Sequence, residues 1–145
     1  SKLLVFCLDA LCTLALEYMK TLPNFKFMFE KGSMIKHVEP VYPSLTYPCH
    51  VSILTGTTAG THGVPHNEIV DVEDDNAPWY SLRSQIKSRT VMDVFKEAGL
   101  KTCSLTWPVS GGANIDYNMP MIVPISYQGD NPLQFYKSLQ PYPDG

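Results

Sequence analysis

The sequence lacks any apolar run long enough to cross a membrane, and it has no cluster of basic residues. The longest apolar run near its N-terminus, Leu3 to Leu8, stops at Asp9, which makes it too short for a transmembrane helix or for the core of a signal peptide. Eleven Lys and Arg stand against fourteen Asp and Glu, giving a formal net charge of -3. We therefore expect no membrane span, a cytoplasmic location and no binding of nucleic acid through bulk charge.

Paired cysteine motifs, internal repeats and low-complexity tracts are also missing from the sequence. Its four cysteines, Cys7, Cys12, Cys49 and Cys103, form no CxxC pair. We interpret them as reduced structural thiols, with a disulfide or a metal thiolate as the alternative. The chain has 145 residues, of which 44% are hydrophobic and 17% charged. This length and composition are typical of one soluble globular domain with a sizeable core.

Strand-like and helix-like patterns alternate over most of the chain, which predicts an α/β fold with a largely parallel sheet. Apolar and β-branched runs predict strands at residues 2–8, 34–41 and 101–107. Helical signals predict a helix from Pro23 to Lys31, with Gly32 just past its end, and a helix with Thr90 as its N-cap that ends at Gly99. A third helix is predicted around residues 51–54, with Ser44 or Thr46 as its N-cap and Gly56 as its stop. We expect a loop at residues 57–68, a solvated turn at 73–76 and a further helix at 132–139.

Two residues lie where active sites form in open parallel sheets, beyond the carboxyl ends of strands. Asp9 ends the first predicted strand, while Thr46 follows the second and opens a helix, whose N-terminus favours an anion. A carboxylate and a hydroxyl at such a place suit a divalent cation that activates the hydroxyl as a nucleophile. From these residues alone two alternatives stay open, Asp9 as a turn former and Thr46 as an ordinary N-cap.

Thr46 also lies within a longer motif. Residues 43–56 read PSLTYPCHVSILTG and residues 61–67 read THGVPHN, which places Asn67 21 residues after Thr46. Shorter matches are Leu8-Asp9-Ala10, residues 22–25 (LPNF) and residues 106–108 (TWP). With these segments, residues 2 to about 110 resemble the nucleotide pyrophosphatase/phosphodiesterase branch of the alkaline phosphatase superfamily.

The resemblance implies a fold, a reaction and three site residues. The fold would be the N-terminal part of an alkaline phosphatase-like sandwich, with a largely parallel sheet flanked by helices. The reaction would be hydrolysis of a small phosphate diester, such as a nucleotide, through a threonine phospho-enzyme. Thr46 would be both the nucleophile and, with Asp9, a ligand of one of two zinc ions, and Asn67 would hydrogen-bond a phosphoryl oxygen. For Asn67 taken alone, a polar loop residue that closes a turn is the alternative.

Several positions depart from the family pattern or invite a different interpretation. Ala10 replaces the usual Gly after the metal-binding Asp, which tightens the local backbone. We interpret Cys49 as a packing thiol rather than a zinc ligand. The resemblance makes the motif histidines scaffold residues rather than ligands: His50, His62 and His66. Thr46 and His50 stand where the sulfatase branch has a modifiable Cys or Ser and an Arg, which excludes formylglycine chemistry. Of the two aromatic residues that could stack on a base, Tyr47 and Trp107, we expect Trp107 to pack in the core.

The resemblance also implies that part of the catalytic domain is missing. The remaining zinc ligands of the superfamily, including an Asp-x-x-Gly-His element, come later in the chain than residue 145, and we interpret Asp144 as part of a terminal turn. We expect residues 1–145 to be the N-terminal portion of one catalytic domain, inactive alone, with an apolar sheet edge that promotes self-association. The alternative is a non-catalytic α/β module that binds a partner or self-associates.

Overall fold

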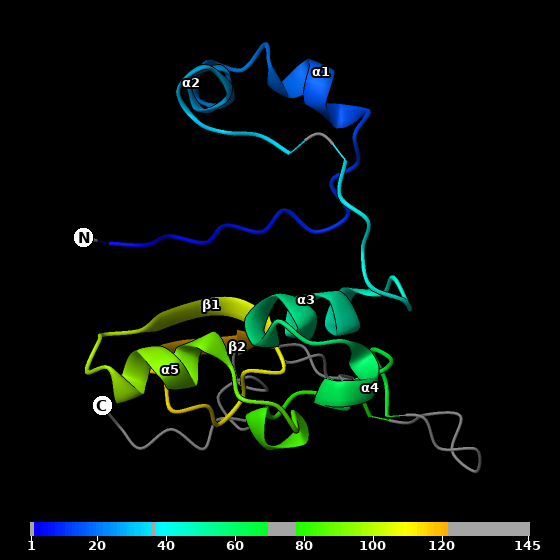
Figure 1. The fold of residues 1–145 in the computed structure, drawn as a ribbon, viewed down its shortest axis with the longest axis vertical. Helices are drawn as coiled ribbons and strands as arrows, with labels where there is room; N and C mark the ends of the chain where they lie inside the picture. Colours follow the sequence, from blue (N-terminus) through cyan, green and yellow to red (C-terminus); the bar gives the residue numbers. More distant parts are fainter. Residues whose placement is uncertain (1, 36, 70–77, 122–145) are drawn as a thin grey trace, which may run out of the picture. The chain divides into compact units, whose positions relative to one another are not determined.

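A computed structural model describes residues 2–35, 37–69 and 78–121 (Figure 1). The chain divides into two compact units, Ser1–Pro40 and Val41–Gly145. The first unit carries the helices α1 (Ala15–Met19) and α2 (Pro23–Lys31). The second carries α3 (Thr46–Thr55), α4 (Ala59–His62), the 3-10 helix η1 (Arg83–Gln85), α5 (Val91–Glu97), β1 (Cys103–Pro108) and β2 (Tyr117–Met121). The predicted turn at residues 73–76, the helix at 132–139 and Asp144 lie outside the described residues.

The first unit confirms one predicted helix and contradicts two predicted strands. Pro23 is the first residue of α2, where its fixed φ suits a helix start, and Gly32 follows the last residue as predicted. Residues 2–8 are not a strand, and Leu4 keeps 85% of its surface exposed. The described residues of 34–41 are not a strand either. A strand needs a neighbour for its backbone hydrogen bonds, and the first unit, as far as it is described, contains none.

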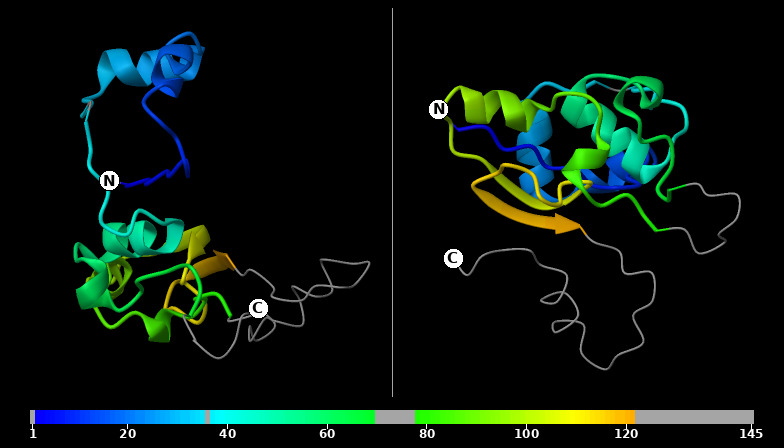
Figure 2. Two further views of the ribbon diagram at one scale, coloured as in Figure 1. Left: turned by 90° about the vertical axis from the view of Figure 1, so that its right-hand side faces the viewer. Right: turned by 90° about the horizontal axis from the view of Figure 1, so that it is seen from below.

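A parallel pair of strands forms the sheet of the second unit, which confirms the α/β class and the strand predicted at residues 101–107. Cys103 pairs with Tyr117 and Leu105 with Met119, and the register then shifts before Pro108 pairs with Met121. The extra residue in β1 falls where Thr106 has φ 54°, a left-handed conformation that is rare for a β-branched residue. Helices α3 and α5 lie on one side of this sheet, as the right-hand view of Figure 2 shows.

The core of the second unit is a small apolar cluster centred on α3. Its fully or almost fully buried members are Tyr47, Val51, Val64, Ile86 and Val109. Partly buried residues from later segments pack against it: Trp79, Tyr80 and Met121. Because two of the five core residues lie on α3, this helix is the element around which the other segments of the unit are arranged.

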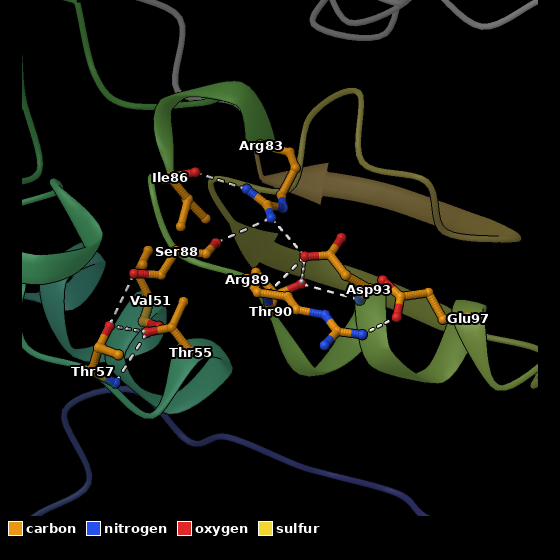
Figure 3. Close-up of polar contacts among 10 residues, drawn as sticks. All are labelled: Val51, Thr55, Thr57, Arg83, Ile86, Ser88, Arg89, Thr90, Asp93 and Glu97. Atoms are coloured by element: carbon orange, nitrogen blue, oxygen red, sulfur yellow. Dashed lines mark hydrogen bonds and ion pairs between the residues drawn. The ribbon is translucent and has the colours of Figure 1, made fainter.

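A hydrogen-bonded brace holds α5 in place (Figure 3). The Thr90 hydroxyl accepts from the Asp93 backbone N–H, while the Asp93 carboxylate accepts from the Thr90 backbone N–H at 2.7 Å, so Thr90 is the N-cap as predicted. Arg83 donates to the same carboxylate at 2.6 Å and to the Ser88 carbonyl at 3.1 Å. Beside them the Ser88 hydroxyl accepts from Thr57, which follows the end of α3, at 3.4 Å. The brace thus joins η1, α5 and the end of α3.

Candidate active site

Thr46 is the first residue of α3, and its side chain is half-buried. The predicted N-caps Ser44 and Thr46 are both wrong, because the N-cap is Leu45, whose backbone is extended. An apolar side chain cannot accept hydrogen bonds from the first turn. The cap must therefore come from elsewhere in the chain. The far end of α3 is as predicted, since Gly56 ends it with φ 66°.

Asn67 supplies that cap. Its Oδ1 accepts from the Tyr47 backbone N–H at 2.9 Å, which is the bond that an N-cap side chain ordinarily makes. The next residue, Pro48, has no N–H to satisfy. A backbone N–H can only donate, so the carboxamide must face Tyr47 with its oxygen, and its Nδ2 donor points away. The structure therefore brings Asn67, as the sequence motif requires, to the residue next to Thr46.

The backbone of Asn67 is fixed as firmly as its side chain. Its carbonyl accepts from the Tyr80 N–H at 3.0 Å, and Glu68 forms an antiparallel bridge with Trp79. The Trp79 ring meets the buried ring of Tyr47 edge to face, with centroids 5.2 Å apart. Burial raises the pKa of Tyr47 to about 12, so the phenol stays protonated. The fully buried Tyr47 ring is a core residue, and it is not placed to stack on a base.

His50 holds the first turns of α3 from within the helix. Its Nδ1 lies 2.7 Å from the Thr46 carbonyl oxygen, and because a carbonyl can only accept, Nδ1 carries the proton. The His50 ring also meets the ring of Trp107 edge to face at 5.0 Å. This contact places Trp107, which is half-buried, against His50 on α3 and outside the apolar core cluster, so the expectation of a core position is not confirmed. Both contacts give His50 a scaffold role.

His62, the last residue of α4, is fully buried and uses both ring nitrogens. Its Nε2 lies 3.0 Å from Ser52 Oγ on α3, and its Nδ1 accepts from the Val64 N–H at 3.2 Å. His66 is more exposed, and its Nδ1 accepts from the Glu68 N–H at 3.3 Å. A metal could reach His62 only by displacing one of these bonds.

Asp9 lies in the first unit, at an exposed turn. Its Oδ1 accepts from the Ala10 N–H at 3.0 Å. Ala10 has φ 58°, so the residue that replaces the family's Gly adopts the left-handed conformation that glycine favours. Within the described ranges, no three His, Cys, Asp or Glu side chains gather in a way that could hold a metal ion. All four cysteines are described, and none is in a disulfide; Cys49 is half-buried and the others are exposed.

An open cleft of about 500 Å³ lies beside the brace of Figure 3, away from these site residues. Its charged lining residues are Arg83, Lys87, Arg89, Asp93, Lys96 and Glu97. Most of these charges are paired with each other, Arg83 with Asp93 and Arg89 with Glu97. The site residues missed by the sequence reasoning are the partners of known ones: Ser52, Val64 and Trp79. No local pattern marks them, because their roles depend on contacts between distant segments.

The sequence model of one family, described as type I phosphodiesterase/nucleotide pyrophosphatase, matches residues 3–141. Among curated proteins, the chain is 30% identical over 126 residues to ectonucleotide pyrophosphatase/phosphodiesterase family member 1 of Homo sapiens, covering 79% of this chain. It is 30% identical over 122 residues to the venom phosphodiesterase of Naja atra, and 28% identical over 101 residues to family member 7 of Rattus norvegicus, covering 76% and 66% of this chain. The matched region spans 13%, 14% and 22% of these three relatives. No helix within the described residues is long and apolar enough to cross a membrane.

Proposed function

Because the chain belongs to the type I phosphodiesterase/nucleotide pyrophosphatase family, we propose that it forms part of a metal-dependent enzyme that hydrolyses small phosphate diesters through a threonine phospho-enzyme. The observation that carries the proposal is the capping of α3 by Asn67 beside Thr46. It puts a hydroxyl and an amide donor together at the positive end of a ten-residue helix, where a phosphate anion is favoured.

Thr46 is proposed as the nucleophile. Its hydroxyl gives its proton to water while its oxygen forms a bond to phosphorus; the bond between phosphorus and the leaving oxygen breaks, and that oxygen takes up a proton from water to leave as an alcohol. A water molecule then attacks the same phosphorus, the bond between phosphorus and Thr46 Oγ1 breaks, and a proton from the attacking water restores the hydroxyl as the phosphomonoester is freed. The backbone that carries the hydroxyl is fixed at the start of α3, because the Thr46 carbonyl is held by His50 Nδ1 as well as by the helix.

Asn67 is proposed to stabilise the charge that develops on the phosphoryl oxygens. Its Oδ1 is already engaged by Tyr47, so the carboxamide cannot turn freely and its Nδ2 donor keeps one direction. A donor oriented before the reaction costs no reorganisation in the transition state. The same bond that caps the helix therefore also orients the catalytic donor.

Asp9 and Thr46 are proposed ligands of one of two zinc ions. Zinc accepts oxygen ligands such as these, neither residue is buried, and a catalytic zinc takes three protein ligands, so further ligands would be needed. Bound there, the ion would supply Lewis-acid chemistry that lowers the pKa of the Thr46 hydroxyl. The relatives' names favour a nucleotide or similar small diester as the substrate.

Capture of the covalent intermediate tests this function. The intact protein that carries these residues is mixed with a bis-aryl phosphate and quenched in acid, and its peptides are analysed by mass spectrometry. We expect an aryl-phosphoryl group on the peptide that contains Thr46, none in Thr46→Ala, and loss of turnover on chelation that zinc restores. Turnover with the adduct on another residue would contradict the proposed nucleophile.

A further inference from the structure

His62 joins the helix that carries Thr46 to the loop that carries Asn67. On one side it contacts Ser52, six residues after Thr46 on α3. On the other it accepts from Val64, three residues before Asn67. Its own carbonyl accepts from the Lys87 N–H at 2.9 Å, which fixes the backbone from which the ring projects. His62 is therefore held in place by the chain on both sides of its ring.

The ring has one defined protonation state. Since the Val64 N–H can only donate, Nδ1 must hold a lone pair, so the proton is on Nε2, which lies 3.0 Å from Ser52 Oγ. Burial lowers the pKa of His62, and a backbone hydrogen bond with Pro48, which is also on α3, acts in the opposite direction to a smaller extent. A neutral ring with its proton on Nε2 can accept from the Val64 N–H and donate towards Ser52 and the Pro48 carbonyl on α3.

The loop between His62 and Asn67 is thus attached to α3 at both of its ends. One attachment runs from Val64 through the His62 ring to Ser52, and the other runs from Asn67 Oδ1 to the Tyr47 N–H. Between them, Val64 is fully buried in the core cluster. If the first attachment is removed, the second has to hold the loop alone.

We propose that His62 is a positioning residue, which fixes the Asn67 carboxamide relative to Thr46 by linking Val64 to Ser52. This inference rests on the proposed function. The ring does not touch the reacting atoms; it acts through Asn67. Misplacing a group by about 1 Å can cost as much as 100-fold in rate. Losing one of the two attachments of the loop should therefore lower kcat less than losing Asn67 itself.

A double-mutant cycle in the intact protein tests the link. His62→Phe keeps a buried ring but removes the hydrogen bonds of the imidazole. We expect it to lower kcat for a bis-aryl phosphate about 10-fold with little change in KM, whereas Asn67→Ala lowers kcat about 100-fold. In the Asn67→Ala background, His62→Phe should have no further effect, because residues that act as a unit are not additive. Thr61→Ala, an exposed neighbour on α4, is the matched control and should leave kcat unchanged.

A second measurement does not depend on activity. Hydrogen exchange of the peptide that contains Tyr47 should be at least several-fold faster in His62→Phe than in the wild type, while Thr61→Ala should not change it. If His62→Phe does not fold, Ser52→Ala carries the same test, with an expected loss of about threefold in kcat that also vanishes in the Asn67→Ala background.

The outcomes separate this inference from the proposed function. The positioning role would be overturned if His62→Phe lowered kcat equally in the wild type and in Asn67→Ala, or if hydrogen exchange of the Tyr47 peptide were unchanged. Either result would leave the proposed roles of Thr46 and Asn67 unaffected. Full activity of Asn67→Ala would overturn the role of Asn67 and the inference that depends on it.

Discussion

The Tyr47 backbone N–H donates to Oδ1 of Asn67, twenty residues further along the chain, over 2.9 Å. One hydrogen bond therefore serves two purposes, the capping of α3 and the orientation of a proposed catalytic amide. The two roles differ in the atom they use, because capping needs the oxygen and catalysis needs the nitrogen. Substitutions can separate them.

Replacement of Asn67 by Asp should separate stability from catalysis. Asp keeps an oxygen acceptor for the Tyr47 N–H but has no amide donor, so the protein should melt near the wild-type temperature while kcat falls at least about 100-fold. Asn67→Ala should lose both the oxygen acceptor and the amide donor. The lost cap should lower the free energy of unfolding by about 1 kcal/mol. Thermal melts and initial rates on the intact protein measure the two effects. Equal stability losses in both variants would argue that the oxygen does not cap α3.

Removal of the Thr46 hydroxyl should abolish turnover without unfolding the protein. Thr46→Ala eliminates the proposed nucleophile, so hydrolysis of an aryl phosphodiester should fall by roughly three or more powers of ten. The side chain is only half-buried, and the substitution removes one hydroxyl and one methyl group, so the loss in melting temperature should be small beside the loss of turnover. If more than about a tenth of the activity survives, a difference of only about 1.4 kcal/mol in the barrier, Thr46 is not the nucleophile.

Lowering the pH should reduce the stability of the second unit, because it protonates Asp116. A hydrogen bond from Lys96 at 2.9 Å, together with the Thr102 N–H at 2.8 Å and Lys101, holds the pKa of the Asp116 carboxyl well below its usual range. Because the pKa of Asp116 is lower in the folded protein than in the unfolded chain, where it is about 3.9, the ionised carboxylate stabilises the fold above that pH. This stability is lost as the pH falls from the unfolded pKa towards the folded one. Urea unfolding at pH 7 and pH 3 should show a smaller pH-dependent loss in Asp116→Asn than in the wild type. Glu30→Gln, on an exposed ion pair of α2, is the control and should retain the full loss.

Relief of backbone strain at Thr106 should stabilise the protein. Thr106 is exposed and has φ 54°, and a left-handed residue other than glycine costs about 1–2 kcal/mol. Asn tolerates this conformation better, so Thr106→Asn should raise the free energy of unfolding by about 0.5–1 kcal/mol. Thr102→Asn serves as a contrast, since Thr102 is buried and bonded to Asp116, and it should destabilise. Equal effects at the two positions would show that φ at Thr106 is not the cause.

The 145-residue chain purified alone should bind no stoichiometric zinc, show no phosphodiesterase activity and self-associate. The proposed ligands Asp9 and Thr46 would serve one ion, whereas a two-metal site needs ions about 3.5–4 Å apart, each with its own set of ligands. One face of the sheet is also apolar and open, with Leu105 66%, Tyr117 68% and Met119 50% exposed. Metal analysis, a bis-aryl phosphate assay and light scattering test these three statements. Leu105→Lys should reduce association; two bound zinc ions with turnover would contradict the first two statements.

The helices could be predicted from the sequence where residues close to their ends mark where they start and stop. Pro23 and Gly32 mark α2, Gly56 marks the end of α3, and Thr90 with Asp93 marks the start of α5, each through a contact made within a few residues. The N-cap of α3 could not be found this way, because its acceptor comes from Asn67. The strand predicted at residues 2–8 has an apolar pattern but no described partner in its unit. The β2 strand was missed because Asn118 and Pro120 interrupt its apolar pattern.

The candidate site was reached from the sequence only through the resemblance. Residue types at strand ends left Asp9 and Thr46 with ordinary structural roles as alternatives, and Asn67 alone indicated a turn. The structure brings Asn67 to the start of α3, as the motif spacing implied. The roles of His62, Ser52 and Val64 depend on the folded contacts between α3 and α4, and no spacing in the sequence predicts them.

The two attachments to α3 also set the length of the segment between His62 and Asn67. Tyr47 and Ser52 are five residues apart on one helix, a rise of about 7.5 Å along its axis. His62 and Asn67 are also five residues apart, and an extended chain of that length could span about 17 Å. Gly63 takes up part of the excess by turning with φ 81°, and the Lys87 Cδ lies 2.9 Å from the place where a β-carbon would be. Insertions or deletions here would displace Asn67 along the helix. We therefore expect the number of residues between His62 and Asn67 to be invariant wherever this site is functional, even where the residues themselves differ.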